Sequence, residues 1–196
     1  MSTDTAFPCR RMRFPALSCR VIAMLKPALV AAGAVLCGGT AAFAHVTLET
    51  QEAPVGSTYK AVLRVPHGCE GKATVAVRVK IPEGMIAVKP MPKPGWDLKT
   101  VKGKYEKPYE LWGEQVTEGV QEVDWSGGRL PDEFYDEFVL RGQLSAALPA
   151  GESIYFPVVQ ECEGGVVDRW IAIPAAGQDA DSLEFPAPGV KLLPKK

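Results

Sequence analysis

The chain has 196 residues, with 22 basic and 23 acidic side chains. Its first 44 residues carry five of the basic side chains and one of the acidic ones, so residues 45–196 carry 17 basic and 22 acidic side chains, a formal charge of −5. An acidic domain argues against nucleic acid as a partner, because nucleic-acid-binding domains present basic stripes. The length after residue 44 suits one domain.

Residues 1–44 have the three parts of a secretory signal peptide. Basic residues come first, the apolar run Ala28–Leu36 follows, and the small-residue stretch Ala42–Ala44 precedes the expected cut. Met24 is an alternative start that leaves this cut unchanged. The apolar run is shorter than the roughly 20 residues of a membrane-spanning helix. We therefore expect cleavage after Ala44, export to the periplasm, and no membrane span in the exported chain.

Cleavage after Ala44 would make His45 the first residue of the exported protein. A histidine at a chain start can offer its α-amine and its ring Nδ1 to one metal ion. His45 is therefore the first candidate metal ligand of this sequence.

Short strand-like segments follow, separated by Gly and Pro, and no long segment has a helical apolar period. Thr58–Val65 and Ala73–Ile81 are two such segments, and Ala73–Ile81 alternates clearly between apolar and polar positions. The other expected strands are Val46–Glu49, Ile86–Lys89, Trp96–Val101, Tyr109–Gln115, Val120–Trp125, Phe138–Leu144, Ile154–Gln160 and Val167–Ile173. This pattern predicts an all-β domain over residues 45–174, a β-sandwich of immunoglobulin-like type.

Three segments should lie outside the regular strands. Lys89–Trp96 is dense in proline and should form a sheet edge or an ordered crossing loop. Gly127-Gly128 has the composition of a hairpin turn. The tail over residues 175–196 lacks strand periodicity, so we expect it to be loosely ordered and assign it no function.

Cysteine usage agrees with export. Cys9, Cys19 and Cys37 belong to the predicted signal peptide, which leaves Cys69 and Cys162. Two cysteines in an exported domain indicate one disulfide. A thiol metal site or redox pair is the alternative, but no CxxC pattern is present and Cys162 has acidic neighbours that disfavour a thiolate.

Few residues could support catalysis. His45 and His67 are the only histidines, and no Gly-x-Ser-x-Gly sequence supplies a nucleophilic serine. Phosphate-binding glycine patterns are absent, and a zinc site with several histidines cannot be assembled. A metal site built around one histidine remains.

Several short motifs together carry a family resemblance. They are His45-Val46-Thr47-Leu48, the segment Pro92–Trp96, Leu130-Pro131, the segment Tyr135–Phe138, and Arg169-Trp170. In this order they resemble the YcnI-like family of exported copper-binding proteins, over essentially the whole chain after residue 44. The resemblance implies an immunoglobulin-like or fibronectin-like β-sandwich that binds one Cu(II) through an N-terminal histidine, a glutamate and a nearby tryptophan.

Carried over to this chain, the resemblance identifies His45 as the chelating ligand, Glu137 as the carboxylate and Trp170 as the tryptophan. Amine, imidazole and carboxylate donors suit the tetragonal geometry of Cu(II). Trp170 would cover one face of the ion, or it is a core residue of its strand. Asp132 and Glu133 are alternative carboxylate ligands, and a solvated charge is the alternative to a ligand role for Glu137.

The remaining histidine and tryptophans receive structural roles. His67 precedes Gly68 in a turn beside the expected disulfide, so we expect it to be structural or exposed. Trp112 and Trp125 should contribute packing or surface cover, and Trp96 could also cap the site from its loop.

The sequence thus favours a periplasmic Cu(II)-binding protein that stores, delivers or detoxifies copper without catalysis. Its partners would be copper and another periplasmic or membrane copper protein. Two alternatives remain. A copper-dependent redox enzyme would need His67 as a second imidazole, and a non-metal interaction domain would leave His45 incidental.

Overall fold

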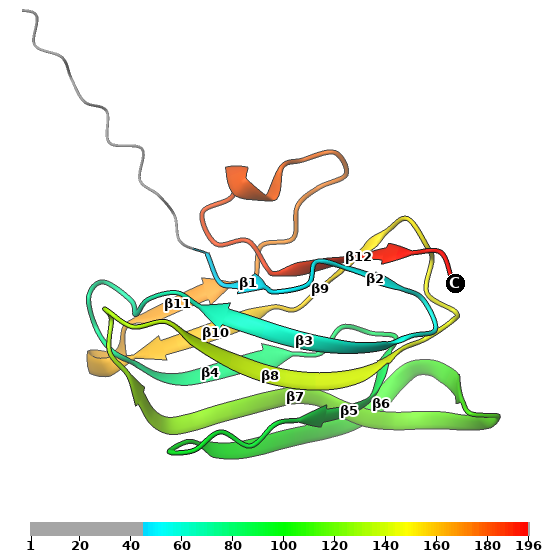
Figure 1. Cartoon of the computed structure of the whole chain (residues 1–196), viewed down its shortest axis with the longest axis horizontal. Coiled ribbons are helices and arrows are strands. Elements are labelled where there is room, and N and C mark those ends of the chain that lie inside the picture. The colour runs from blue at the N-terminus through cyan, green and yellow to red at the C-terminus, as the bar shows by residue number, and fades with distance from the viewer. Residues whose placement is uncertain (1–44, 196) are drawn as a thin grey trace, which may run out of the picture. The chain divides into compact units, whose positions relative to one another are not determined.

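The computed structural model describes residues 45–195, which belong to one compact unit (Figure 1). The predicted signal peptide, residues 1–44, lies outside the described residues, so cleavage after Ala44 stays a prediction. Within residues 45–195, no helical segment is long and apolar enough to cross a membrane.

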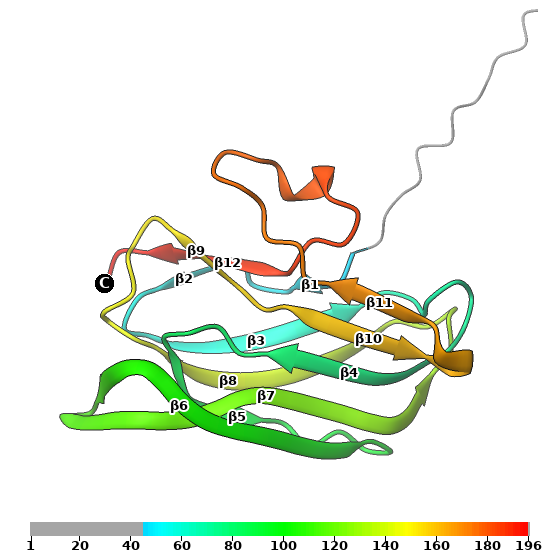
Figure 2. The same cartoon turned by 180° about the vertical axis from the view of Figure 1, so that it is seen from behind.

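Three sheets build the described part of the chain. The first sheet has the order β1-β3-β8-β5, formed by Thr47–Leu48, Thr58–Val65, Asp136–Leu144 and Met85–Pro90. The second has the order β11-β10-β4-β7-β6, formed by Val167–Trp170, Val158–Cys162, Thr74–Lys80, Glu114–Leu130 and Asp97–Leu111 (Figure 2). The third has the order β2-β12-β9, formed by Glu52–Pro54, Gly189–Leu193 and Ser153–Tyr155. Two short 3₁₀ turns complete the elements, η1 (Glu163–Gly165) and η2 (Ala180–Ser182).

Apolar side chains from the first two sheets meet in one core. Phe138 of β8 packs edge-on against Trp125 of β7, with 5.6 Å between ring centroids, and both side chains are fully buried. In β3, Leu63 and Val65 point into the core while Lys60 points outward. This alternation follows from the two-residue period of a strand. The all-β, immunoglobulin-like sandwich expected from the sequence is confirmed.

The proline-dense segment forms a sheet edge and a crossing loop, as its composition predicted. Its first part belongs to β5, the edge strand of the first sheet, and the chain then crosses to β6 in the second sheet. Trp96, at the end of the crossing, packs edge-on against Phe138 with 5.0 Å between ring centroids. Trp96 therefore ties the crossing loop to the core.

The expected hairpin turn at Gly127-Gly128 is wrong, because both residues lie inside the long strand β7. Gly127 has a φ of 75°, a left-handed conformation that a strand tolerates at an irregularity. Gly128 lies directly beneath the indole ring of Trp96, so that a Cβ atom there would overlap the ring. Gly128 makes room for the crossing loop, and neither glycine reverses the chain.

Replacing Gly128 by alanine should therefore destabilise the fold. The added methyl group must displace Trp96 from its packing on Phe138. We expect a loss of about 1–3 kcal/mol in the free energy of unfolding, measured by urea denaturation. Gly103→Ala, on the neighbouring strand β6, is the matched control because its methyl group meets the flexible side chain of Gln121. Equal losses in the two variants would contradict the role assigned to Gly128.

The chain reverses at Trp112-Gly113, inside a segment expected to be one strand from Tyr109 to Gln115. Leu111 of β6 pairs with Glu114 of β7, which leaves a two-residue loop. Trp112 and Gly113 have φ values of 52° and 87°. Positive φ at both loop residues defines the type I′ turn that matches the twist of paired strands. The sequence pattern did not predict this turn, because the first residue of a type I′ turn is usually asparagine, aspartate or glycine and not tryptophan.

The expectation of a loosely ordered tail over residues 175–196 is also wrong in its second half. Residues 189–193 form β12, which pairs in parallel with β2 and antiparallel with β9. Val190 and Leu192 are fully buried while Lys191 between them is exposed. A strand this short shows only one period of alternation, so it could not be separated from the proline-rich residues before it.

The expected disulfide is confirmed. Cys69 and Cys162 are bonded, with 5.9 Å between their Cα atoms and a sequence separation of 93. The bond joins the turn between β3 and β4 to the end of β10, and both cysteines are buried. It therefore closes a long loop at one end of the sandwich.

Candidate metal centre

His45 lies two residues before β1, the edge strand that pairs with β3. Its side chain is only 10% exposed. The imidazole ring contacts the indole ring of Trp170, with 5.8 Å between ring centroids and a tilt of 58° between the planes. The structure thus brings together two of the three residues that the family resemblance implied.

Trp170 ends β11 and is 3% exposed. Its indole Nε1 donates a hydrogen bond of 3.0 Å to Oε1 of the buried Gln160, and its ring packs against Phe185 with 5.1 Å between centroids. The hydrogen bond and the ring packing both restrain the indole ring. Trp170 is therefore a core residue that also forms a wall beside His45, which joins the two roles considered for it.

Gln160 anchors this wall to the end of the sandwich that carries the disulfide. Its amide Nε2 donates to Oγ1 of Thr74 and to the backbone carbonyl of His67, each at 2.8 Å. Both amide hydrogens and the amide oxygen are used, as a fully buried amide requires. His67 itself is half-buried, with Nδ1 beside the carbonyl oxygen of Gly68. Its surroundings agree with the structural role expected for a turn residue.

The C-terminal segment supplies an acidic neighbour that the sequence argument missed. The Asp181 carboxylate lies in η2 with one oxygen 4.0 Å from Nδ1 of His45. The backbone N–H of Asp181 donates to the carboxylate of Asp179, which caps the turn. An Asp-x-Asp pattern of this kind is common in turns. Nothing in the pattern itself indicates that the turn folds back to the chain segment preceding β1.

A groove of about 370 Å³ runs beside His45. It is lined from three parts of the chain: the β1 segment with His45 and Leu48, Tyr155 of β9, and the C-terminal segment with Asp181 and Pro188. His45 is therefore shielded on its Trp170 side and borders open space on another. An ion could reach the imidazole without unfolding of the sandwich.

Glu137 lies two strands away from the β1 segment, on the outer face of the first sheet. Thr47 of β1 is paired with Arg64 of β3, which is paired with Glu137 of β8. The Nε atom of Arg64 lies 3.7 Å from Oε1 of Glu137, and its Nη2 lies 3.1 Å from the Glu49 carboxylate. The carboxylate that the resemblance identified is thus held by an arginine.

Tyr135 shows which face of the strand carries the Glu137 side chain. Its hydroxyl donates a hydrogen bond to Oε1 of Glu137, so the two side chains share one face while Phe138 is buried on the other. The hydrogen bond to Glu137 is the main cause that raises the pKa of Tyr135 above its usual value, since the neutral phenol is the donor.

The alternative carboxylates have different surroundings. Oδ1 of Asp132 accepts a hydrogen bond of 3.0 Å from the backbone N–H of Gly68, so it holds the turn between β3 and β4. Glu133 is exposed in the loop before β8. Across residues 45–195, no three His, Cys, Asp or Glu side chains gather closely enough to hold a metal ion between them. Side chains alone therefore do not complete a metal site in the described residues.

The comparisons with known proteins agree with this fold. Residues 45–192 match the family described as "Domain of unknown function (DUF1775)". No curated protein matches the chain significantly. A solved structure from Nocardia farcinica, described as an uncharacterized protein with an immunoglobulin-like fold, is 27% identical with a TM-score of 0.56. The match covers 76% of this chain and 98% of that one. The chain therefore belongs to the DUF1775 family, the family to which the sequence resemblance pointed.

Proposed function

We propose that this protein is exported and binds one Cu(II) at His45 in order to store, deliver or detoxify copper, without catalysis. The observation that supports this most is the placement of His45. Its imidazole is held against Trp170, borders a groove and has a carboxylate oxygen 4.0 Å from Nδ1. An imidazole held in place loses little freedom when it binds a metal ion.

The donor set fits Cu(II). In the exported chain, the α-amine and Nδ1 of His45 would supply two nitrogen atoms, and a carboxylate would add an anionic oxygen. Cu(II) prefers such nitrogen and oxygen donors in a tetragonal plane. Trp170 has no lone pair suited to strong coordination, so its role would be to exclude water from one side of the ion. The proposed site needs only two side chains, because the α-amine supplies the third donor. It therefore does not require a cluster of three metal-binding side chains, and none is present within residues 45–195.

Two carboxylates compete for the third position. The family resemblance favours Glu137, whereas Asp181 is the acid that contacts His45 in the structure. Glu137 would have to give up its contacts with Arg64 and with the Tyr135 hydroxyl. Asp181 is 89% exposed and belongs to a short turn, so it can shift toward His45 at little cost. Geometry therefore favours Asp181, with Glu137 as the second candidate.

Copper titration of carboxylate variants tests both assignments. On protein that begins with His45, Asp181→Asn should lower Cu(II) affinity by about tenfold, the effect of losing one charged ligand. Glu137→Gln should lower it less. Electron paramagnetic resonance should show a changed Cu(II) spectrum only for the variant that loses a ligand.

Glu184→Gln is the matched control, because it removes the same charge from the same segment. If only Glu137→Gln lowers the Cu(II) affinity, Glu137 rather than Asp181 is the carboxylate ligand. If the unaltered protein shows neither a copper spectrum nor a copper-dependent melting temperature, the copper proposal is wrong.

A further inference from the structure

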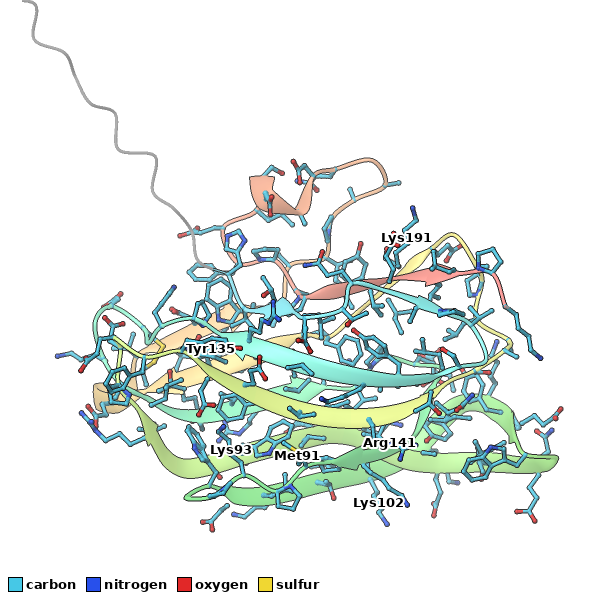
Figure 3. The ribbon with its side chains drawn as sticks, viewed as in Figure 1. Met91, Lys93, Lys102, Tyr135, Arg141 and Lys191 are labelled. Atoms are coloured by element: carbon cyan, nitrogen blue, oxygen red, sulfur yellow. A yellow bond between two sulfur atoms is a disulfide. The ribbon has the colours of Figure 1, made fainter. Side chains whose placement is uncertain are left out.

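Three basic side chains stand side by side on the outer face of the first sheet. Arg141 of β8 is paired with Lys60 of β3 on one side and with Lys89 of β5 on the other. All three are exposed, whereas their neighbours Ala61, Val88 and Leu140 are buried. Figure 3 shows Arg141 on this face, with Met91 nearby. We call Lys60, Arg141 and Lys89 the cationic row.

The cationic row lacks the acidic partners found elsewhere in this domain. Arg64, on the same sheet face, has two carboxylates, and Lys93 has Asp136 at 2.6 Å. Arg129 has Glu163 at 2.7 Å. Within residues 45–195, no carboxylate lies within ion-pair distance of any member of the row. Like charges directly opposite each other destabilise a sheet, so this arrangement weakens the fold unless an anion neutralises it.

Two exposed apolar side chains lie at the two ends of this surface. Met91, between two prolines, is 52% exposed and borders one groove with all three members of the row. Trp112, at the tip of the β6–β7 hairpin, is 87% exposed and borders a second groove with Lys89 and Arg141. Because the grooves share these two cations, the apolar groups and the row form one continuous surface.

Trp112 occupies a position that its backbone does not favour. Its φ of 52° belongs to the left-handed region, where a bulky side chain is uncommon. Its ring gains little from packing at this exposure. Neither backbone preference nor core packing therefore accounts for a tryptophan here, whereas contact with an apolar and polar boundary would suit its indole ring.

The polar groups near the row do not converge on a small anion. The Thr58 hydroxyl donates to Oε1 of Gln143, and Nε2 of Gln143 donates to the carbonyl of Gly56. These groups are engaged with one another, so only the spread charges of the row remain. Spread charge between two apolar groups matches an extended anionic surface better than a single bound phosphate.

We propose that this face, formed by the cationic row, Met91 and Trp112, docks on a bilayer that contains anionic phospholipids. The row would lie over the headgroups, where each Lys or Arg strengthens binding electrostatically. Trp112 and Met91 would enter the interfacial region, as amphipathic and apolar side chains do. The face is independent of His45, so this proposal does not rest on copper binding.

Sedimentation with vesicles tests the docking. The exported protein should bind vesicles of phosphatidylcholine mixed with phosphatidylglycerol, should not bind phosphatidylcholine alone, and should be released by high salt. The triple variant Lys60→Gln, Lys89→Gln, Arg141→Gln should lower the partition coefficient on the order of a hundredfold, about fivefold per charge. Trp112→Ala should weaken binding and abolish the blue shift of tryptophan fluorescence on anionic vesicles.

The control is a variant with the same charge change elsewhere, Lys72→Gln, Lys99→Gln, Lys104→Gln, all exposed residues away from the row. Equal losses in the two triple variants would overturn the proposal, and so would the absence of binding to anionic vesicles at low salt. Analytical ultracentrifugation without lipid tests whether a second copy of this chain binds the same face instead. If the protein is a dimer and only the triple variant of the cationic row is a monomer, the face is a dimer interface and the membrane-docking proposal is wrong.

Discussion

A protein that keeps one methionine before His45 should bind Cu(II) more than about tenfold more weakly than a protein that begins with His45. The extra residue converts the α-amine into an amide, which removes one nitrogen donor and the chelate ring. The structure holds the imidazole against Trp170, so the second nitrogen would remain in place. Isothermal titration with Cu(II) and electron paramagnetic resonance on both forms measure the effect.

The His45→Ala substitution, made in protein that begins at residue 45, separates the contribution of the imidazole from that of the α-amine. It should lower affinity at least as much as the extension, because the amine remains without its ring partner. Protein extended by one residue at its C-terminal end is the matched control and should bind as the unaltered form does. Equally tight binding by all forms would exclude the terminal chelate.

Removal of the disulfide should destabilise the fold more than the Gly128→Ala substitution does. Replacing Cys69 and Cys162 by serine should lower the free energy of unfolding by about 3–5 kcal/mol, since the bond closes a loop of 93 residues in the unfolded chain. Urea denaturation of the double variant and of the oxidised protein measures the difference. No other cysteine occurs in residues 45–196, so thiol titration reports directly on this bond.

Reduction of the unaltered protein should lower its urea midpoint to that of the double variant. Agreement between the two would separate loss of the bond from effects of the serine side chains. A midpoint unchanged by reduction would contradict a stabilising role.

Strands with clear alternation could be predicted from the sequence, whereas elements defined by a single turn or by distant pairing could not. The bounds of β3 follow from its pattern of apolar and polar residues. The turn at Trp112-Gly113 was missed because its first residue is atypical for a positive φ. Strand β12 was missed because its stability comes from pairing with β2 and β9, which no local pattern reveals.

The candidate site shows the same division. The family resemblance indicated His45 and Trp170, and the structure places their rings in contact. It also indicated Glu137, whose partner Arg64 becomes visible only through the register of β3 and β8. Asp181 is separated from His45 by almost the whole domain in sequence and approaches it only because the C-terminal segment folds back. Electrostatic partners across sheets depend on register and topology, which alternation does not encode.

The parallel pairing of β2 with β12 decides where a purification handle or a fluorescent label belongs. Both strands run in the direction away from β1, and Leu193 is paired with Pro54 at the end of β2 (Figure 1). A tag attached beyond Leu193 would thus project from the end of β12 that lies away from β1 (Figure 1). A tag joined directly before His45 would block the α-amine that the proposed copper site uses.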